Sequence, residues 1–286
     1  MSVLPENPVP ALPVPSGPIA RRYVGKVAFI TGAARGQGRA EAVRLAAEGA
    51  DIIALDLCAD IPTTTYSGST PEDLAETVAQ VEKLDRRIVP IQADIRDYEV
   101  VESTLKAAVA ELGRLDVVIA NAGMTSAARV WEIDAEHWRT TLDINLNGAF
   151  HTAKAAIPIM IEQGTGGAIV FTSSVAGLVG LPFLGDYVAA KHGVTGLSKT
   201  LANELAEYRI RVNTVHPHGV LTGLQMTEIQ SFSAQYPLLA PMFMGSLPDG
   251  ISQAEDIAAA VAWLASDEAR HVTGIQLPVD LGRTNR

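Results

Sequence analysis

Cysteine is almost absent from this sequence of 286 residues, in which Cys58 stands alone. A single cysteine excludes an intrachain disulfide and cannot build a metal site from thiolates. Because proteins without disulfides are typical of reducing compartments, we expect a cytoplasmic protein. Free cysteines are usually small buried residues, so we expect Cys58 to pack in the core near the end of a strand.

Long apolar runs and an excess of positive charge are also missing. No uninterrupted stretch of apolar residues reaches about 18 residues, the length that a transmembrane helix needs. The formal net charge is −10, and such a surface repels phosphate backbones and anionic lipid. We therefore expect neither a nucleic-acid partner nor membrane binding.

The first 22 residues have neither the basic start nor the apolar stretch of a secretory signal. Prolines at positions 5, 8, 10, 13 and 15 would interrupt any helix or strand ladder there. We predict a flexible, proline-rich arm over residues 1–22, followed by one catalytic domain over residues 23–286. An arm that wraps around a neighbouring subunit is the alternative.

Beyond the arm, apolar segments typical of buried strands alternate with segments of helical periodicity. This pattern indicates a parallel sheet covered on both faces, and the right-handed crossover rule makes it doubly wound. We predict a single α/β domain. The expected strands are 27–31, 51–55, 88–92, 117–120, 168–172, 211–215 and 275–279, and the expected helices are 38–48, 71–84, 98–111, 135–162, 187–207 and 254–265.

Three glycines lie between the first expected strand and the first expected helix, in the sequence TGAARGQG at residues 31–38. Gly32, Gly36 and Gly38 permit a tight turn and let a pyrophosphate approach the backbone, while the helix N-terminus offers free N–H groups. A glycine loop in this position is typical of a dinucleotide-binding site.

Asp56 ends the second expected strand and indicates which dinucleotide is bound. A carboxylate there accepts hydrogen bonds from the adenosine ribose and repels the 2′-phosphate of NADP. Arg35 favours the opposite choice, because a basic residue in the glycine loop can bind that phosphate. We favour Asp56 and therefore NAD, while an exposed strand-end acid is the simpler interpretation of the same residue.

Tyr187 and Lys191 stand four residues apart in the sequence YVAAK, which places both on one face of a helix. A phenol has an ordinary pKa of about 10. A neighbouring ammonium favours the phenolate and makes the tyrosine a usable acid or base nearer neutral pH. The pair therefore predicts proton transfer at Tyr187, although a solvated helix face carries the same spacing.

Ser174 follows the fifth expected strand, at the sheet edge where ligands bind in open α/β sheets. Its hydroxyl can hold a carbonyl or alcohol oxygen for Tyr187, and Ser173 competes for this role. Asn145 lies within a long expected helix, where a buried asparagine needs a reason. It could hold a water in a proton relay from Lys191, and Asn147 is the competing candidate.

Together these pieces resemble the short-chain dehydrogenase/reductase family over residues 26–282. The matching segments are TGAARGQG at 31–38, AD at 93–94, NAG at 121–123, Asn145, SS at 173–174, YVAAK at 187–191 and HPHGVLT at 216–222. The resemblance implies a Rossmann-type sheet of seven strands and a homotetramer.

The same resemblance assigns roles to individual residues. It implies that Asn145, Ser174, Tyr187 and Lys191 form the catalytic set. It also implies that Asp94 and Ile95 meet the adenine, that Asn121 and Gly123 meet the ribose region, that Val220 and Thr222 meet the nicotinamide amide, and that Lys191 binds the nicotinamide ribose. The complete set of expected cofactor contacts is Gly32, Arg35, Gly36, Gln37, Gly38, Asp56, Leu57, Asp94, Ile95, Asn121, Ala122, Gly123, Tyr187, Lys191, Val220 and Thr222.

Residues 59–70 do not fit the alternation of strands and helices, and ordered loops of this length are usually functional. The sequence from 58 to 97 resembles the actinobacterial subgroup that includes carveol dehydrogenases and mycofactocin-coupled dehydrogenases. This implies an insertion that packs over the cofactor, slow exchange of NAD, and a separate redox partner that re-oxidises the bound NADH. An ordinary surface insertion is the alternative.

Residues 218–252 form the second such segment and are rich in apolar side chains. Beside an active site they predict a lid over a hydrophobic pocket, although a subunit interface would use similar residues. We predict oxidation of a hydrophobic, terpenoid-like secondary alcohol to its ketone with NAD. The apolar residues are Leu221, Leu224, Met226, Phe232, Tyr236, Leu238, Leu239, Met242, Phe243 and Met244.

One residue departs from the family pattern, because His218 stands between Pro217 and Gly219 and leaves the nicotinamide contact open. His216 and His218 suggest a metal, but no third ligand is placed, so we expect packed or solvated histidines and no metal. Two rival functions remain: an NADPH-dependent carbonyl reductase, favoured by Arg35, and a non-catalytic dinucleotide-binding regulator on the same fold.

Overall fold

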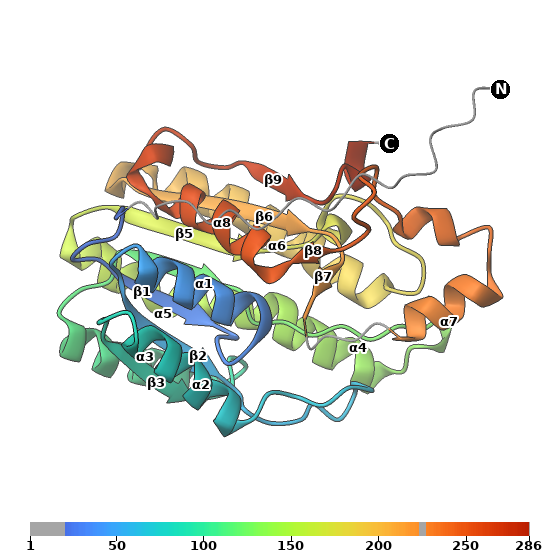
Figure 1. Cartoon of the computed structure of the whole chain (residues 1–286), viewed down its shortest axis with the longest axis horizontal. Helices are drawn as coiled ribbons and strands as arrows, with labels where there is room; N and C mark the ends of the chain where they lie inside the picture. Colours follow the sequence, from blue (N-terminus) through green and yellow to red (C-terminus); the bar gives the residue numbers. More distant parts are fainter. Residues whose placement is uncertain (1–20, 223–226, 286) are drawn as a thin grey trace.

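The computed structural model describes residues 21–222 and 227–285. In these ranges a parallel seven-stranded sheet with the order β3-β2-β1-β4-β5-β6-β9 forms the centre (Figure 1). Its strands are β1 (Val27–Thr31), β2 (Asp51–Asp56), β3 (Ile88–Gln92), β4 (Val117–Ala120), β5 (Gly167–Thr172), β6 (Ile210–Pro217) and β9 (Gln276–Val279). The chain reverses its direction across the sheet between β3 and β4, which creates a crevice at the carboxyl ends of β1 and β4. The predicted doubly wound α/β fold is confirmed.

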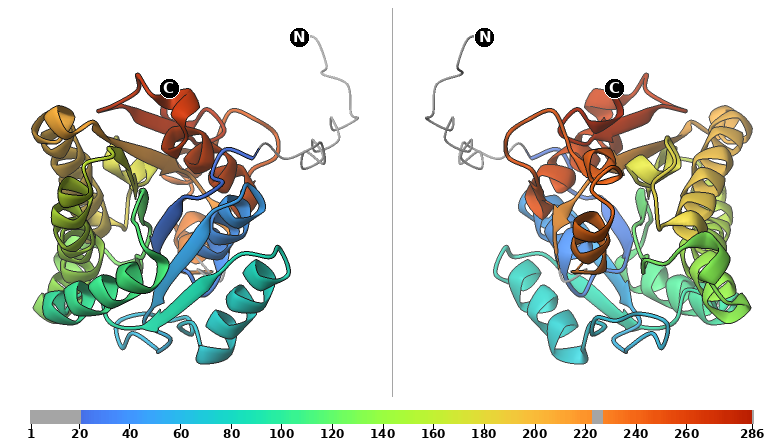
Figure 2. Two further views of the ribbon diagram at one scale, coloured as in Figure 1. Left: turned by 90° about the vertical axis from the view of Figure 1, so that its left-hand side faces the viewer. Right: turned by 90° about the vertical axis from the view of Figure 1, so that its right-hand side faces the viewer.

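Helices cover both faces of the sheet, as the end-on views in Figure 2 show. One face carries α1 (Gly36–Ala47), α2 (Pro71–Glu82) and α8 (Ala254–Ala265), and the other carries α3 (Tyr98–Leu112), α5 (Gly148–Gln163) and α6 (Gly185–Glu204). Alternate strand residues supply the two cores, since Phe29 of β1 packs with the second group of helices and Ile30 with the first.

Short-range signals explain where two of the helices begin. At α2, Thr70 accepts from Asp73 N at 3.2 Å, and the Asp73 carboxylate accepts from Thr70 N at 2.9 Å, which forms a capping box before Pro71. At α3, the Asp97 carboxylate accepts from the backbone N–H of the third helical residue. The sequence placed both starts correctly.

The prediction of one long helix over residues 135–162 is wrong in detail. The chain forms α4 (Ala135–Leu142), then a π-helical turn, η2 (Asp143–Asn147), and then α5. A π-turn accommodates one extra residue and is frequent at functional sites. Pro158 remains inside α5.

The segment 218–252 contains structure that the sequence did not predict. It holds β7 (Val220–Leu221), which pairs with β8 (Ser252–Gln253), together with α7 (Thr227–Gln235) and η5 (Ala240–Phe243). Leu224 and Met226 lie outside the described residues. The remaining short helices are η1 (Val130–Glu132), η3 (Val175–Gly177), η4 (Ala206–Tyr208), η6 (Asp267–Ala269) and η7 (Arg283–Asn285).

Residues 1–20 of the predicted arm also lie outside the described residues. Arg22 is bound to the body of the domain, with its guanidinium 2.6 Å from Glu48 and 3.0 Å from Glu268, so the ordered domain begins slightly earlier than expected. None of the described helices combines the length and the apolar character that crossing a bilayer requires.

Candidate active site

Two adjoining cavities lie at the carboxyl ends of the strands and share Gln37, Asn121, Gly123 and Met124. The first follows the glycine loop towards β2 and β3, and the second contains Ser174, Tyr187 and Lys191. The predicted cofactor residues that line the first cavity are Gly32, Arg35, Gly36, Gln37, Asp56, Leu57, Asp94, Ile95, Asn121, Ala122, Gly123 and Thr222. Two further predicted contacts, Gly38 and Val220, do not line either cavity.

The glycine loop is built to admit a ligand to its backbone. Gly32 and Gly36 have left-handed φ angles of +70° and +57°, and a Cβ at Gly38 would lie 2.1 Å from the Gly32 carbonyl oxygen. Gly38 thus packs α1 against the loop. In the described chain, no side chain caps the N-terminus of α1 and no acid lies in its first turn, so its N–H groups suit a pyrophosphate.

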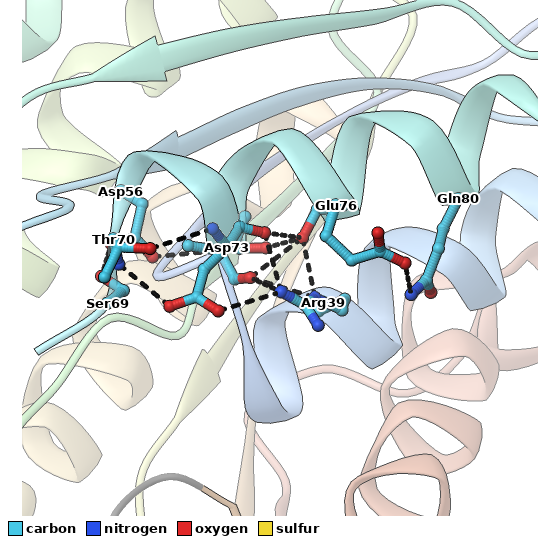
Figure 3. Close-up of polar contacts among 10 residues, drawn as sticks. Arg39, Asp56, Ser69, Thr70, Asp73, Glu76 and Gln80 are labelled. Carbon is cyan, nitrogen blue, oxygen red and sulfur yellow. Dashed lines mark hydrogen bonds and ion pairs between the residues drawn. The ribbon is translucent and has the colours of Figure 1, made fainter.

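Asp56 holds the glycine loop and the insertion together, as Figure 3 shows for its contact with Ser69. One carboxylate oxygen accepts from Ala34 N at 2.9 Å, and the other accepts from Ser69 Oγ at 2.5 Å and Cys58 N at 3.1 Å. Carboxylate oxygens accept several hydrogen bonds, so these contacts are compatible with ribose binding at the same side chain.

Arg35, which favoured NADP in the sequence, is engaged elsewhere. Its guanidinium donates to the backbone oxygen of Ser67 at 2.5 Å and thereby joins the glycine loop to the insertion. Arg39 supports the same region from α1, donating to the Asp73 carbonyl at 2.7 Å (Figure 3). The geometry therefore gives Arg35 a structural contact at the rim of the cofactor cavity.

The insertion 59–70 spans the first cavity. Ile61, Thr64 and Tyr66 line it together with residues of the glycine loop. The phenolic oxygen of Tyr66 accepts from Thr125 N at 3.2 Å, which connects the insertion to the loop after β4. Cys58, at the start of the insertion, is buried as predicted and has a left-handed φ of +51°. The insertion thus lines the cavity and links the end of β2 to the loop after β4.

The second cavity brings together three of the four predicted catalytic residues, and burial shapes their electrostatics. The Lys191 ammonium donates to the Thr172 carbonyl at 2.8 Å and lies 5.5 Å from the centre of the Tyr187 ring. Burial lowers the pKa of Lys191 to about 8. Burial also raises the pKa of Tyr187 to about 12, against a hydrogen bond with Ser174 that lowers it. The expected net lowering of the Tyr187 pKa by Lys191 is therefore not observed.

Ser174 and its neighbour Ser173 face different surroundings. Ser173 Oγ donates to the Lys191 carbonyl at 3.2 Å, which directs it into α6. Ser174 Oγ accepts from Ala176 N at 3.1 Å and is hydrogen-bonded to Tyr187. The structure thus favours Ser174 for contact with a substrate oxygen.

His216, which the sequence indicated only as a packed residue, positions this serine. Its Nδ1–H donates to the Ser174 carbonyl at 2.7 Å, and its Nε2 lies 2.7 Å from Thr214 Oγ1. Burial lowers the pKa of His216 to about 4, so the imidazole is neutral. No group of three metal-ligating side chains gathers within residues 21–222 and 227–285.

Asn145 lies at the π-turn, beside the second cavity. Its Nδ2 donates to the carbonyls of Met124 and Thr141 at 2.9 Å, and its Oδ1 accepts from Met124 N at 3.2 Å. A Cβ at Gly123 would lie 2.7 Å from Asn145 Oδ1 and 3.6 Å from Lys191 Nζ, so these residues flank Gly123. Asn147 instead binds Asp143 on the exposed side of the helix, which leaves Asn145 as the candidate.

The segment 218–252 packs apolar side chains beside Tyr187. Phe183 stacks on Phe232 of α7 with ring centres 4.4 Å apart. His218 Nε2 donates to the Phe243 carbonyl at 2.8 Å, and this bond fixes η5 to the end of β6. Other predicted lid residues are exposed, above all Leu238 at 92%. The cluster around Tyr187 comprises Phe183, Leu184, Ile229, Phe232, Tyr236, Leu239 and Phe243.

Comparison with known proteins agrees with this geometry. The family model for short chain dehydrogenases matches residues 26–231. A (−)-trans-carveol dehydrogenase from Rhodococcus erythropolis is 43% identical, with 92% of this chain and 99% of that protein covered. A short chain dehydrogenase from Mycobacterium paratuberculosis, solved with NAD bound, is 46% identical with a TM-score of 0.91 over 93% of this chain and 100% of that one. Carveol dehydrogenase from Mycobacterium avium, in complex with NAD, is 49% identical with a TM-score of 0.88 over 93% and 99% of the two chains. The chain belongs to the short-chain dehydrogenase family.

Proposed function

We propose that the protein is an NAD-dependent oxidoreductase that interconverts a hydrophobic secondary alcohol and its ketone by hydride transfer. The observation that carries this proposal is the shared cavity of Ser174, Tyr187 and Lys191, which adjoins a cleft built around the glycine loop. A hydroxyl, a phenol and an ammonium at the end of a dinucleotide cleft are the groups that alcohol oxidation needs.

Two features favour NAD over NADP. Asp56 ends β2 at the adenosine side of the cleft, where its charge would repel a 2′-phosphate. Arg35, the cation that could compensate, is bound to the Ser67 carbonyl. NAD is also the dinucleotide in the related structures from M. paratuberculosis and M. avium.

Each residue of the catalytic set has a defined task. NAD, when bound, would supply the acceptor for the hydride of the alcohol carbon. Ser174 holds the alcohol oxygen, and Tyr187, as phenolate, takes the hydroxyl proton. Because burial raises the pKa of Tyr187 to about 12, the charge of Lys191 would have to stabilise the phenolate as the proton moves. The position of Lys191 beside Gly123 suits a bond to the nicotinamide ribose. Asn145 braces the loop after β4 and supports a water-mediated proton path from Lys191.

The remaining contacts to the dinucleotide are assigned by position in the first cavity. We propose that Asp94 and Ile95 meet the adenine and that Asn121, Ala122 and Gly123 meet the ribose, since all five line the first cavity. Thr222 packs against Gly36, with its Cβ 3.2 Å from a Cβ built there, which suits the nicotinamide end. Val220 would act through its backbone in β7.

The apolar cluster around Tyr187 indicates the substrate class. Aromatic and aliphatic side chains of the segment 218–252 pack onto Phe183 and Leu184 in a cluster against which Tyr187 of the second cavity also packs. Such a surface suits an apolar, cyclic skeleton better than a sugar or polyol. We therefore propose a terpenoid-like alcohol of the carveol type, in line with the names of the relatives from R. erythropolis and M. avium.

We further propose that the insertion retains NAD between turnovers. Closure through Ser67, Ser69 and Tyr66 would slow exchange, so that a separate redox partner, mycofactocin in the subgroup that this chain resembles, re-oxidises the NADH in place. We also propose that the protein is cytoplasmic and assembles as a homotetramer.

The test is a panel of alcohols and both dinucleotides offered to the purified protein. We expect oxidation of cyclic, apolar secondary alcohols with NAD and weak turnover with NADP. Turnover confined to small polyols or charged sugars would contradict the substrate class, and a preference for NADPH would favour the carbonyl reductase. Dinucleotide binding without any turnover would favour the regulator.

A further inference from the structure

We propose that Asp186 is a positioning residue that fixes the catalytic Tyr187, and that Thr141 couples it to Asn145. This inference rests on the proposed function, because it concerns the geometry of the same hydride-transfer site. It assigns a role to a polar cluster of the buried Ser126, Thr141 and Asp186 with the partly exposed His137, none of which lines the second cavity.

Asp186 precedes Tyr187 directly and lies in the first turn of α6. Its side chain is only 1% exposed. Thr141 Oγ1 donates to Asp186 Oδ2 at 2.6 Å, and His137 Nε2 lies 3.4 Å from the same oxygen. Both partners belong to α4, so the polar side chain next to Tyr187 is held by a different helix.

The start of α6 has few other polar anchors. Its N-cap residue is Leu184, which makes no side-chain capping bond. A carboxylate in the first helical turn is favoured by the helix dipole, but its burial requires hydrogen-bonding partners. Asp186 Oδ1 has no partner among the described residues, so Thr141 and His137 carry most of the compensation. The pairing therefore determines where α6 begins relative to α4.

The same threonine reaches the other side of the site. The Thr141 carbonyl accepts from Asn145 Nδ2 at 2.9 Å. Asn145 in turn exchanges hydrogen bonds with the backbone of Met124. One buried series of contacts thus runs from the loop after β4, through Asn145 and Thr141, to Asp186. It ties the π-turn to the start of α6, and so fixes Asn145 and Tyr187 relative to each other.

The cluster contains a serine, a histidine and an aspartate, but its geometry excludes a nucleophilic triad. Ser126 Oγ and Asp186 Oδ2 both approach the same imidazole nitrogen, His137 Nε2. A triad needs the serine and the aspartate on opposite nitrogens, so that the imidazole accepts from one and donates to the other. The arrangement therefore serves to hold Asp186 in place.

The experiment compares Thr141→Val, which removes the hydroxyl and keeps the shape, with Thr141→Ser, which restores a hydroxyl. Thr140→Val is the matched control, because it makes the same change one residue earlier on α4, outside the cluster. Small displacements of a catalytic group are costly. We expect Thr141→Val to lower kcat by about tenfold or more while KM and NAD affinity stay within about twofold, and Thr141→Ser to recover most of the loss.

A kcat within about twofold of the wild type in Thr141→Val, or a loss of thermal stability without a loss of kcat, would overturn the positioning role. If Thr141→Val does not fold, His137→Gln disturbs the same oxygen from its more exposed side. Crystal structures of wild type and variant with NAD give a readout independent of turnover. An unmoved Tyr187 hydroxyl refutes the inference, whereas a wild type inactive on every alcohol refutes the proposed function alone.

Discussion

Replacing Tyr66 by phenylalanine removes one hydroxyl from the insertion and should release the dinucleotide faster. The phenolic oxygen accepts from Thr125 N at 3.2 Å across the first cavity. A neutral hydrogen bond contributes about 1 kcal/mol net, and about 1.4 kcal/mol corresponds to a factor of ten in an equilibrium constant. If closure limits release, the rate of NADH dissociation should rise about fivefold.

Stopped-flow displacement of bound NADH by excess NAD, followed by nicotinamide fluorescence, measures this rate. Thr63→Val is the matched control, because the Thr63 hydroxyl lies in the same insertion, is buried and has no partner in the described residues. An unchanged rate in Tyr66→Phe, or an equal acceleration in Thr63→Val, would refute the reasoning that this bond holds the insertion closed.

Three further predictions concern buried polar groups. Glu41 is fully buried and both its oxygens lack partners in the described chain, so burial raises its pKa. Glu41→Met should stabilise the protein by about 1–3 kcal/mol at pH 7 in urea unfolding, and the gain should shrink towards pH 4, where the acid is neutral in both states. Because the pKa of Lys191 is lowered to about 8, Lys191→Met should abolish turnover yet stabilise the fold at pH 7, and this gain should disappear as pH approaches 10.5, the ordinary lysine value. Ser174→Ala should reduce kcat about a hundredfold and Ser173→Ala far less; equal losses would contradict the orientation of the two hydroxyls.

Much of the fold was predictable because local signals agree with tertiary packing. β1, β3, β4 and α8 have the bounds that the sequence predicted. The apolar residues of β1 and β4 and the apolar face of α8 are buried as expected, whereas only Ile91 is buried in β3, at the edge of the sheet. The π-turn was not predictable. The sequence keeps its helical periodicity through residues 143–147, so it gives no sign of the turn. The turn is associated instead with a tertiary contact, the hydrogen bonds between the Asn145 side-chain amide and the backbone of Met124.

The lid was missed as structure for a related reason. Helix α7 is only nine residues long, and its one aromatic residue, Phe232, packs on Phe183, which lies in a separate loop before α6. The role of His216 was likewise hidden, because its partner is the backbone oxygen of Ser174, just beyond the end of the neighbouring strand β5. The sequence alone also left open which of Ser173 and Ser174 directs its hydroxyl towards Tyr187.

The most direct test of the central claim is a single turnover with the dinucleotide bound to the protein. The NAD-loaded protein is mixed with a carveol-type alcohol, and the near-ultraviolet absorbance of reduced nicotinamide is followed for wild type and Tyr187→Phe. We expect close to one equivalent of NADH per site in the wild type and almost none in the variant, which should still hold NAD. Equal formation of NADH by both proteins would contradict proton transfer at Tyr187 and the mechanism built on it.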